Sequence, residues 1–151
     1  MDQEKFKSIV ESAIEREIEA VELYTRLADH ASRKNVTVFF NEMAEEEGKH
    51  RYLLVEFLEN SHGHDLKLQD VPDLKIGDYL EEKEYSDGMS FQDALVMSIK
   101  KEEHARDLYK FLADTNLDPE AQTLFNFLSQ QEAKHKLKLE KEYDDAILSE
   151  D

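Results

Sequence analysis

Two glutamate–histidine pairs are the residues of this sequence best suited to bind a metal ion. Glu47 and His50 stand three residues apart in EEEGKH, and Glu132 and His135 repeat the spacing in QQEAKH. In a helix, side chains at this spacing leave neighbouring parts of one face, so a carboxylate and an imidazole can reach the same ion. One such pair is more often solvated surface, because glutamate is common in this chain. The predicted helices around these pairs therefore have to be considered to distinguish a metal site from surface residues.

The sequence repeats itself at an offset of 85 residues. YTRLAD at 24–29 returns as YKFLAD at 109–114, and both glutamate–histidine pairs obey the same offset. This regularity indicates that one helix pair occurs twice, as after a duplication. We therefore expect a single domain over 1–151 with halves at about 1–62 and 88–147.

Four segments carry apolar residues at the spacing of a helix. We expect helices at about 3–32, 35–60, 90–116 and 118–146. Ser90 with Asp93 is a variant of the capping box, and Asp118 before Pro119 is a typical helix start. Glycine and proline are scarce, at four and two residues, which favours long helices.

The segment 61–89 separates the two halves and is too long for a hairpin between adjacent helices. We interpret it as a crossover that returns the chain along a four-helix bundle, with a short helix at GDYLEEK. A disordered insert is the alternative. The predicted fold class is thus all-α, a ferritin-like four-helix bundle with one long crossover between the second and third helices.

Each predicted helix has a seam of apolar residues at alternating steps of three and four, interrupted by ionisable residues at mid-helix. The ionisable residues in these seams are Glu17, Glu47, His50, Glu102, Glu132 and His135. Four carboxylates in one apolar core would repel one another and lose hydration, at about several kcal/mol per ion. Raised pKa values would relieve this. Two divalent cations would balance the four charges more simply, so we predict a metal site.

Other residues of similar type do not share this pattern. Glu59 and His62 have the same spacing but lie off the seam, and we interpret them as surface, together with His30, His64 and His104. Tyr24 and Tyr109 each follow a seam glutamate by seven residues. Their hydroxyls could orient a carboxylate ligand, or the rings could be ordinary core aromatics.

Composition excludes several other classes of protein. The chain has 36 acidic against 19 basic residues, a net charge of −17, which argues against nucleic acid or an anionic membrane as partner. Cysteine is absent, which excludes disulfides, thiolate metal sites and thiol catalysis. The start lacks the features of a signal peptide and no apolar run is long enough to span a membrane, so we expect a cytoplasmic protein.

These motifs resemble the rubrerythrin and bacterioferritin branch of the ferritin-like superfamily. EIEAVELYTRLA and EEHARDLYKFLA are similar to its Glu-x-x-Ala-x-x-x-Tyr helices, and EEEGKH and QQEAKH to its Glu-x-x-His helices. The resemblance implies two iron ions, with manganese or zinc as alternatives. It implies that Glu17 and Glu102 are terminal ligands, that Glu47 and Glu132 bridge the metals, and that His50 and His135 each hold one.

Two features differ from the family pattern. Rubrerythrins often carry a cysteine-ligated rubredoxin domain, whereas this chain has no cysteine, so we expect an external electron donor. Where rubrerythrins add a carboxylate one turn beyond the third-helix glutamate, this chain has Ala105. The set of six ligands is therefore closer to that of bacterioferritin.

The predicted function is oxidation of Fe(II) by O2 or hydrogen peroxide at a non-haem di-iron centre, in oxidative stress or iron handling. A di-iron monooxygenase or hydroxylase and a non-enzymatic metal-binding bundle are the alternatives. The sequence leaves the oligomeric state open, with a homodimer among the alternatives.

Overall fold

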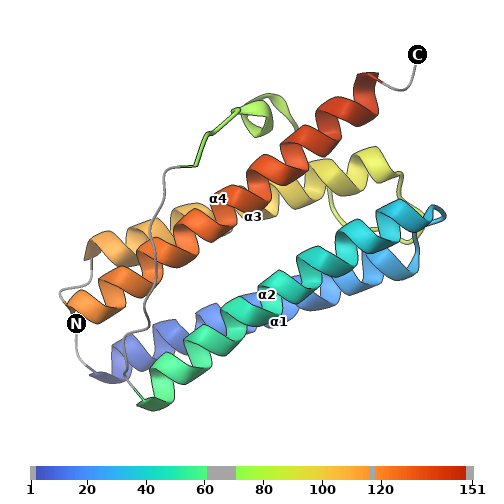
Figure 1. Ribbon diagram of the computed structural model, residues 1–151. Helices are drawn as coiled ribbons and strands as arrows, with labels where there is room; N and C mark the ends of the chain where they lie inside the picture. Colours follow the sequence, from blue (N-terminus) through green and yellow to red (C-terminus); the bar gives the residue numbers. More distant parts are fainter. Residues whose placement is uncertain (1–2, 61–70, 116–117, 149–151) are drawn as a thin grey trace. The chain divides into compact units, whose positions relative to one another are not determined.

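The computed structural model describes residues 3–60, 71–115 and 118–148, and these residues form four α-helices and one short 3-10 helix. The α-helices are α1 (Gln3–Asp29), α2 (Lys34–Asn60), α3 (Phe91–Thr115) and α4 (Pro119–Leu148). The 3-10 helix η1 (Ile76–Tyr79) lies between α2 and α3 in the chain (Figure 1). No strand occurs within these ranges. All four predicted helices are confirmed to within a few residues at each end.

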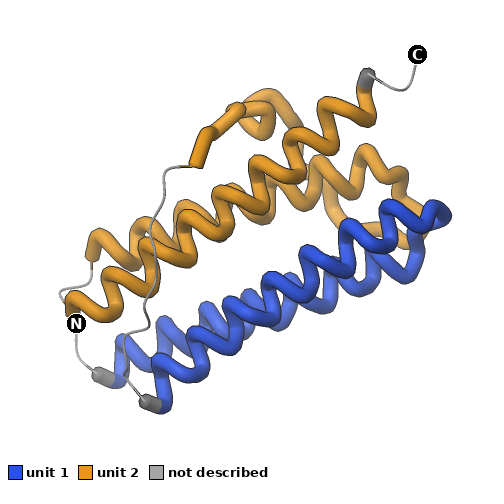
Figure 2. Tube along the Cα trace, in the orientation of Figure 1, with its two compact units in different colours: residues 1–64 blue, residues 65–151 orange. Residues whose placement is uncertain are grey.

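The chain divides into two compact units, each built around one helix pair (Figure 2). Unit 1 covers Met1–His64 and contains α1 packed on α2, and unit 2 covers Asp65–Asp151 and contains α3 packed on α4. Unit 2 also contains most of the predicted crossover, residues 61–89. The predicted halves at about 1–62 and 88–147, and their union in one domain, stay predictions.

The helix ends follow the capping signals of the sequence. The backbone N–H of Asp93 donates to Ser90 Oγ at 3.0 Å, and the N–H of Glu120 donates to Asp118 Oδ1 at 3.2 Å. These side chains satisfy N–H groups that have no acceptor within the first helical turn. In unit 1, Thr37 Oγ1 donates to the carbonyl of Ala28 at 3.2 Å and ties the start of α2 to the end of α1. Gly63, the predicted stop signal after α2, lies outside the described residues.

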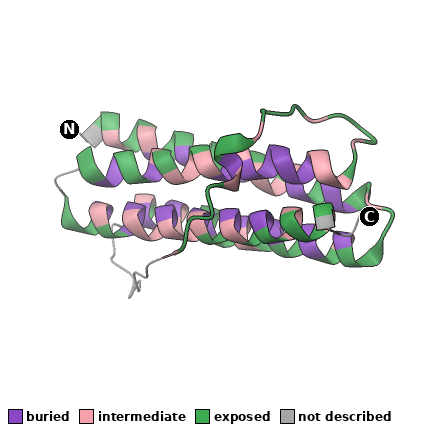
Figure 3. Ribbon diagram, turned by 90° about the horizontal axis from the view of Figure 1, so that it is seen from above, coloured by how far each residue is buried: buried purple, intermediate pink, exposed green. Residues whose placement is uncertain are grey.

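Buried residues recur along each helix, as the alternating spacing predicts (Figure 3). In α2 and α4 the predicted seams are buried at every position, namely Val36, Phe40, Met43, Glu47, His50, Leu54 and Phe57, and Ala121, Phe125, Leu128, Glu132, His135 and Leu139. A buried apolar side chain of this size contributes about 1.5–3 kcal/mol to folding. The seams therefore supply both the packing energy and a dry setting for the charged residues between them.

The described part of the predicted crossover is ordered, and it packs on the helices of unit 2. The segment contacts α3 through η1, and it contacts α4 through Asp73, whose Oδ1 accepts a hydrogen bond from Lys136 Nζ. The predicted short helix at GDYLEEK is wrong in extent, because the helix begins at Ile76 and ends at Tyr79. Residues 61–70 lie outside the described residues. For residues 71–90, these contacts favour a packed segment over the disordered alternative.

Candidate metal centre

In unit 1, α1 and α2 bring three predicted ligands together. Donor atoms of Glu17, Glu47 and His50 all lie within 4.8 Å of one another. His50 Nδ1 is 3.8 Å from Glu17 Oε2 and 3.7 Å from Glu47 Oε1. Two atoms that ligate one ion at about 2.1 Å each are separated by at most about 4.2 Å. Both distances to His50 Nδ1 fall below this limit, so the imidazole can share a cation with either carboxylate.

Unit 2 repeats this set of ligands on α3 and α4. Donor atoms of Glu102, Glu132 and His135 likewise lie within 4.8 Å of one another, and His135 Nδ1 is 3.7 Å from Glu102 Oε2. We call these three residues the unit 2 set, and Glu17, Glu47 and His50 the unit 1 set. The same residue types at the same helical positions thus give nearly the same spacing in both units.

Both sets consist of side chains that seldom lie inside a protein without a compensating charge. All six are buried, with exposed fractions of 1–6%. In each set, two ionised carboxylates and a neutral imidazole carry a charge of −2, which one divalent cation balances. Carboxylate oxygen with imidazole nitrogen is a donor set suited to iron, manganese and zinc. The residues present therefore fit a metal ion in each unit.

The two predicted tyrosines are buried beside aromatic side chains. Tyr24 stacks on Phe40 at a centroid distance of 6.0 Å, and Tyr109 stacks on Phe125 at 6.2 Å. Both tyrosines are 1% exposed, so their rings belong to the core. The proposed contact of each hydroxyl with a carboxylate ligand stays a prediction.

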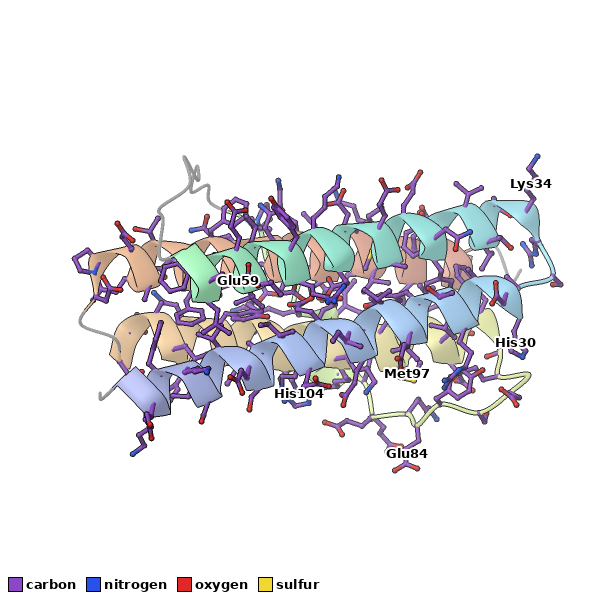
Figure 4. The ribbon with its side chains drawn as sticks, turned by 90° about the horizontal axis from the view of Figure 1, so that it is seen from below. His30, Lys34, Glu59, Glu84, Met97 and His104 are labelled. Carbon is purple, nitrogen blue, oxygen red and sulfur yellow. The ribbon has the colours of Figure 1, made fainter. Side chains whose placement is uncertain are left out.

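The described glutamates and histidines that were assigned to the surface are exposed, as predicted. His30 lies at the end of α1 and is exposed, and Glu59 near the end of α2 is also exposed (Figure 4). His104 is exposed and its Nε2 lies 2.9 Å from Glu82 Oε1. Glu46, the neighbour of a predicted ligand, pairs with Lys49 at 3.4 Å instead of joining the set. His62 and His64 lie outside the described residues.

Sequence reasoning missed a second group of charged residues beside the unit 2 set. Lys136, which follows His135 directly, is only 2% exposed, and Glu140 is fully buried. A lysine and a glutamate four residues apart are also an ordinary surface ion pair, so their spacing carried no sign of burial. The cause of burial is the crossover, which no periodicity in α4 reveals.

Lys136 and Asp73 of this group stabilise each other's ionised forms. Burial by itself lowers the pKa of Lys136, but its hydrogen bonds to Asp73 and Glu140 raise that pKa above its ordinary value. Burial by itself raises the pKa of Asp73, whereas hydrogen bonds from Lys136 and from the Lys75 N–H bring it below its ordinary value. Both groups are therefore charged near neutral pH.

Comparison with known proteins places these features in a family. The family model described as Rubrerythrin matches residues 8–86 and 93–151. A crystal structure of an uncharacterized conserved protein from Magnetospirillum magnetotacticum MS-1 is similar to this chain, with a TM-score of 0.67 and 25% identity. The similarity covers 91% of this chain and 92% of that one. No curated protein matches the sequence.

The shared fold confirms the predicted fold class, an all-α ferritin-like four-helix bundle. Among the described residues, no helix combines the length and the apolar character needed to cross a membrane.

Proposed function

The chain belongs to the rubrerythrin family, and from this premise we propose that it is a non-haem di-iron oxidoreductase that oxidises Fe(II) with O2 or hydrogen peroxide. The observation that carries the proposal is the set of two glutamates and one histidine that recurs, buried, in both units. A single pair of buried carboxyl groups could be protonated and contribute only to packing. Two equivalent sets at one offset in the sequence favour a retained requirement for two metal ions.

The residues have distinct roles in this proposal. Glu17, Glu47 and His50 hold one iron ion, and Glu102, Glu132 and His135 hold the other. When bound, each Fe(II) supplies one electron. Reduction of hydrogen peroxide to two waters takes two electrons and two protons, so two ligand sets match the requirement. The carboxylates offset the extra positive charge after oxidation, and the apolar seam residues exclude bulk water from the ligands.

The first experiment measures bound iron and the oxidation of Fe(II) in matched variants. We expect about two irons per chain in the wild type, and a rise in the near-ultraviolet absorption of ferric iron after addition of hydrogen peroxide. Glu47→Ala and Glu132→Ala remove one carboxylate from each set, and each should abolish this reaction, because removing a ligand costs several kcal/mol of metal binding. Glu45→Ala is the matched control, since Glu45 is an exposed glutamate of the same helix.

The outcomes separate the alternatives. Turnover that survives in both Glu47→Ala and Glu132→Ala would contradict the assignment of the ligands. Tight binding of zinc or manganese without any reaction with oxidants would identify a non-enzymatic metal-binding protein. A rate that rises with an added organic substrate would identify a hydroxylase.

A further inference from the structure

A cluster of charged side chains joins the crossover to α3 and α4 in unit 2. Lys136 Nζ donates to Asp73 Oδ1 at 2.5 Å and to Glu140 Oε2 at 3.0 Å. Arg106 Nη1 donates to Asp73 Oδ2 at 3.1 Å. Asp73 thus links a lysine of α4 to an arginine of α3 through its two carboxylate oxygens. We call Asp73, Arg106, Lys136 and Glu140 the crossover cluster.

The backbone of η1 takes part in the same contacts. The N–H of Gly77 donates to Glu140 Oε2 at 3.2 Å, so this oxygen accepts from both the crossover and Lys136. A side chain at Gly77 would place its Cβ 2.8 Å from Glu103 Oε2 and 2.9 Å from Ile99 Cγ2. The crossover therefore approaches α3 as closely as a glycine backbone allows.

The cluster is connected to the unit 2 set through the helices that carry both. Lys136 directly follows His135, and Arg106 comes four residues after Glu102. Arg106 also accepts a hydrogen bond at its carbonyl from Ser129 Oγ, at 2.9 Å, which ties α3 to α4. Because an α-helix turns as a stiff rod over a few residues, a rotation that moved His135 away would also separate Lys136 from Asp73.

We propose that Asp73 is a positioning residue for the unit 2 metal ligands. By holding Lys136 and Arg106, Asp73 fixes the rotation of α4 and α3, and so keeps Glu102, Glu132 and His135 arranged before the metal binds. The printed partners of Asp73, namely Lys75, Arg106 and Lys136, all lie in unit 2, so its effect is expected on the unit 2 set and not on the unit 1 set. This inference rests on the proposed function, since it assumes that the six residues are ligands.

The test isolates the unit 2 set in the full-length chain and uses Co(II), whose visible absorption reports binding. A chain with Glu17→Ala and His50→Ala keeps only the unit 2 set intact. Adding Asp73→Asn should weaken its Co(II) affinity by about tenfold, the lower end of the effect of groups that support metal ligands. Asp78→Asn is the matched control, because Asp78 is an exposed aspartate of η1, and it should leave the affinity unchanged.

A second variant, which keeps only the unit 1 set, tests whether the effect of Asp73→Asn is specific to unit 2. A chain with Glu102→Ala and His135→Ala keeps only the unit 1 set, and there Asp73→Asn should leave Co(II) affinity unchanged. An equal loss in both backgrounds would show a general effect on folding and would overturn the positioning role. An equal effect of Asp73→Asn and Asp78→Asn in the unit 2 background would overturn it as well.

The reciprocal effect of metal binding on the crossover can be measured in the wild-type chain, without variants of the ligands. If docking of the crossover strengthens metal binding, metal binding must strengthen docking by the same factor. Amide hydrogen exchange at Gly77, whose N–H donates to Glu140, should therefore slow by about tenfold when Co(II) is added to the wild-type chain. Unchanged exchange would contradict the proposal. Failure of the wild type to bind Co(II) at all would instead refute the proposed function.

Discussion

The two units carry the same residues in their ligand sets, but different residues at the positions that contact the crossover in unit 2. Unit 2 has charged side chains there, and the crossover covers them. Unit 1 has mostly apolar, half-exposed side chains at the equivalent positions. The equivalent pairs, unit 2 first, are Glu103 and Ile18, Arg106 and Val21, Lys136 and Arg51, and Glu140 and Val55.

This difference teaches which constraints each face obeys. The same glutamates and histidines recur at the same offset in the two ligand sets, as expected where particular donor atoms are required. The positions that meet the crossover in unit 2 need only to complement the segment that covers them. In unit 2 the cover is a polar segment with a carboxylate and a backbone N–H, which require lysine, arginine and glutamate as partners. Arg51, the counterpart of Lys136, is exposed and has no such requirement.

We expect the largest loss of folding stability from Lys136→Met. Removing the ammonium leaves the carboxylate of Glu140 buried without its compensating charge, and breaking a buried ion pair in this way costs about 3–5 kcal/mol. Arg51→Met, at the equivalent exposed position of unit 1, should change stability by no more than about 0.5 kcal/mol. Urea denaturation of the two variants measures both free energies of unfolding. Equal effects at the two positions would break the comparison.

A double variant sharpens the same point. Lys136→Met with Glu140→Val removes both charges and installs at 140 the residue type that unit 1 has at Val55. Replacing a whole buried pair by apolar groups is often close to neutral, so most of the loss from Lys136→Met should be recovered. A double variant as unstable as Lys136→Met would contradict this account.

Replacing glycine by alanine should change folding stability by an intermediate amount, with opposite signs in the two units. Gly77→Ala forces a Cβ against Ile99, so it should destabilise unit 2 by about 1–3 kcal/mol. Gly48 lies within α2 and a Cβ there would meet nothing within 4 Å. Gly48→Ala should therefore stabilise the chain by about 0.5–1 kcal/mol, because glycine is a poor helix former. Thermal unfolding of both variants measures the signs, and matching signs would contradict the expectation.

The smallest effect concerns pH and Asp73. Its pKa in the folded chain is lowered, so the ionised form contributes stability above its unfolded pKa of about 3.9. That stability is lost as pH falls through the lower folded value. The side chain is 39% exposed, which limits the contribution to less than about 1 kcal/mol.

The measurement is the difference in free energy of unfolding between wild type and Asp73→Asn in the metal-depleted chain, from pH 7 to pH 3. Using the difference removes the contribution of the other carboxylates, which titrate in both chains. The difference should be constant near neutral pH and shrink below about pH 4. A difference that grows in acid would show that Asp73 is destabilising in the folded chain.

Much of the fold and of the candidate centre was predictable from the sequence. The helix ends at Ser90 and Asp118 were recognisable because capping is local, and the seams were recognisable because burial repeats every three to four residues. Glu17 and Glu102 stood out as the charged members of otherwise apolar seams. Lys136 and Glu140 did not stand out, because charged residues off the seam are usually solvated and nothing nearby in the sequence marks them as covered.

By itself, the sequence determined the four helices, their internal repeat and the six candidate ligands, since all of these depend on spacing within a helix. Only the tertiary structure decided that Asp73 meets Lys136, 63 residues further along the chain. It also decided that Gly77 closes against α3 and that α4 is covered where α2 has exposed Arg51. Such contacts depend on where an irregular segment comes to rest, which is set by packing and charge complementarity and leaves no period in the sequence.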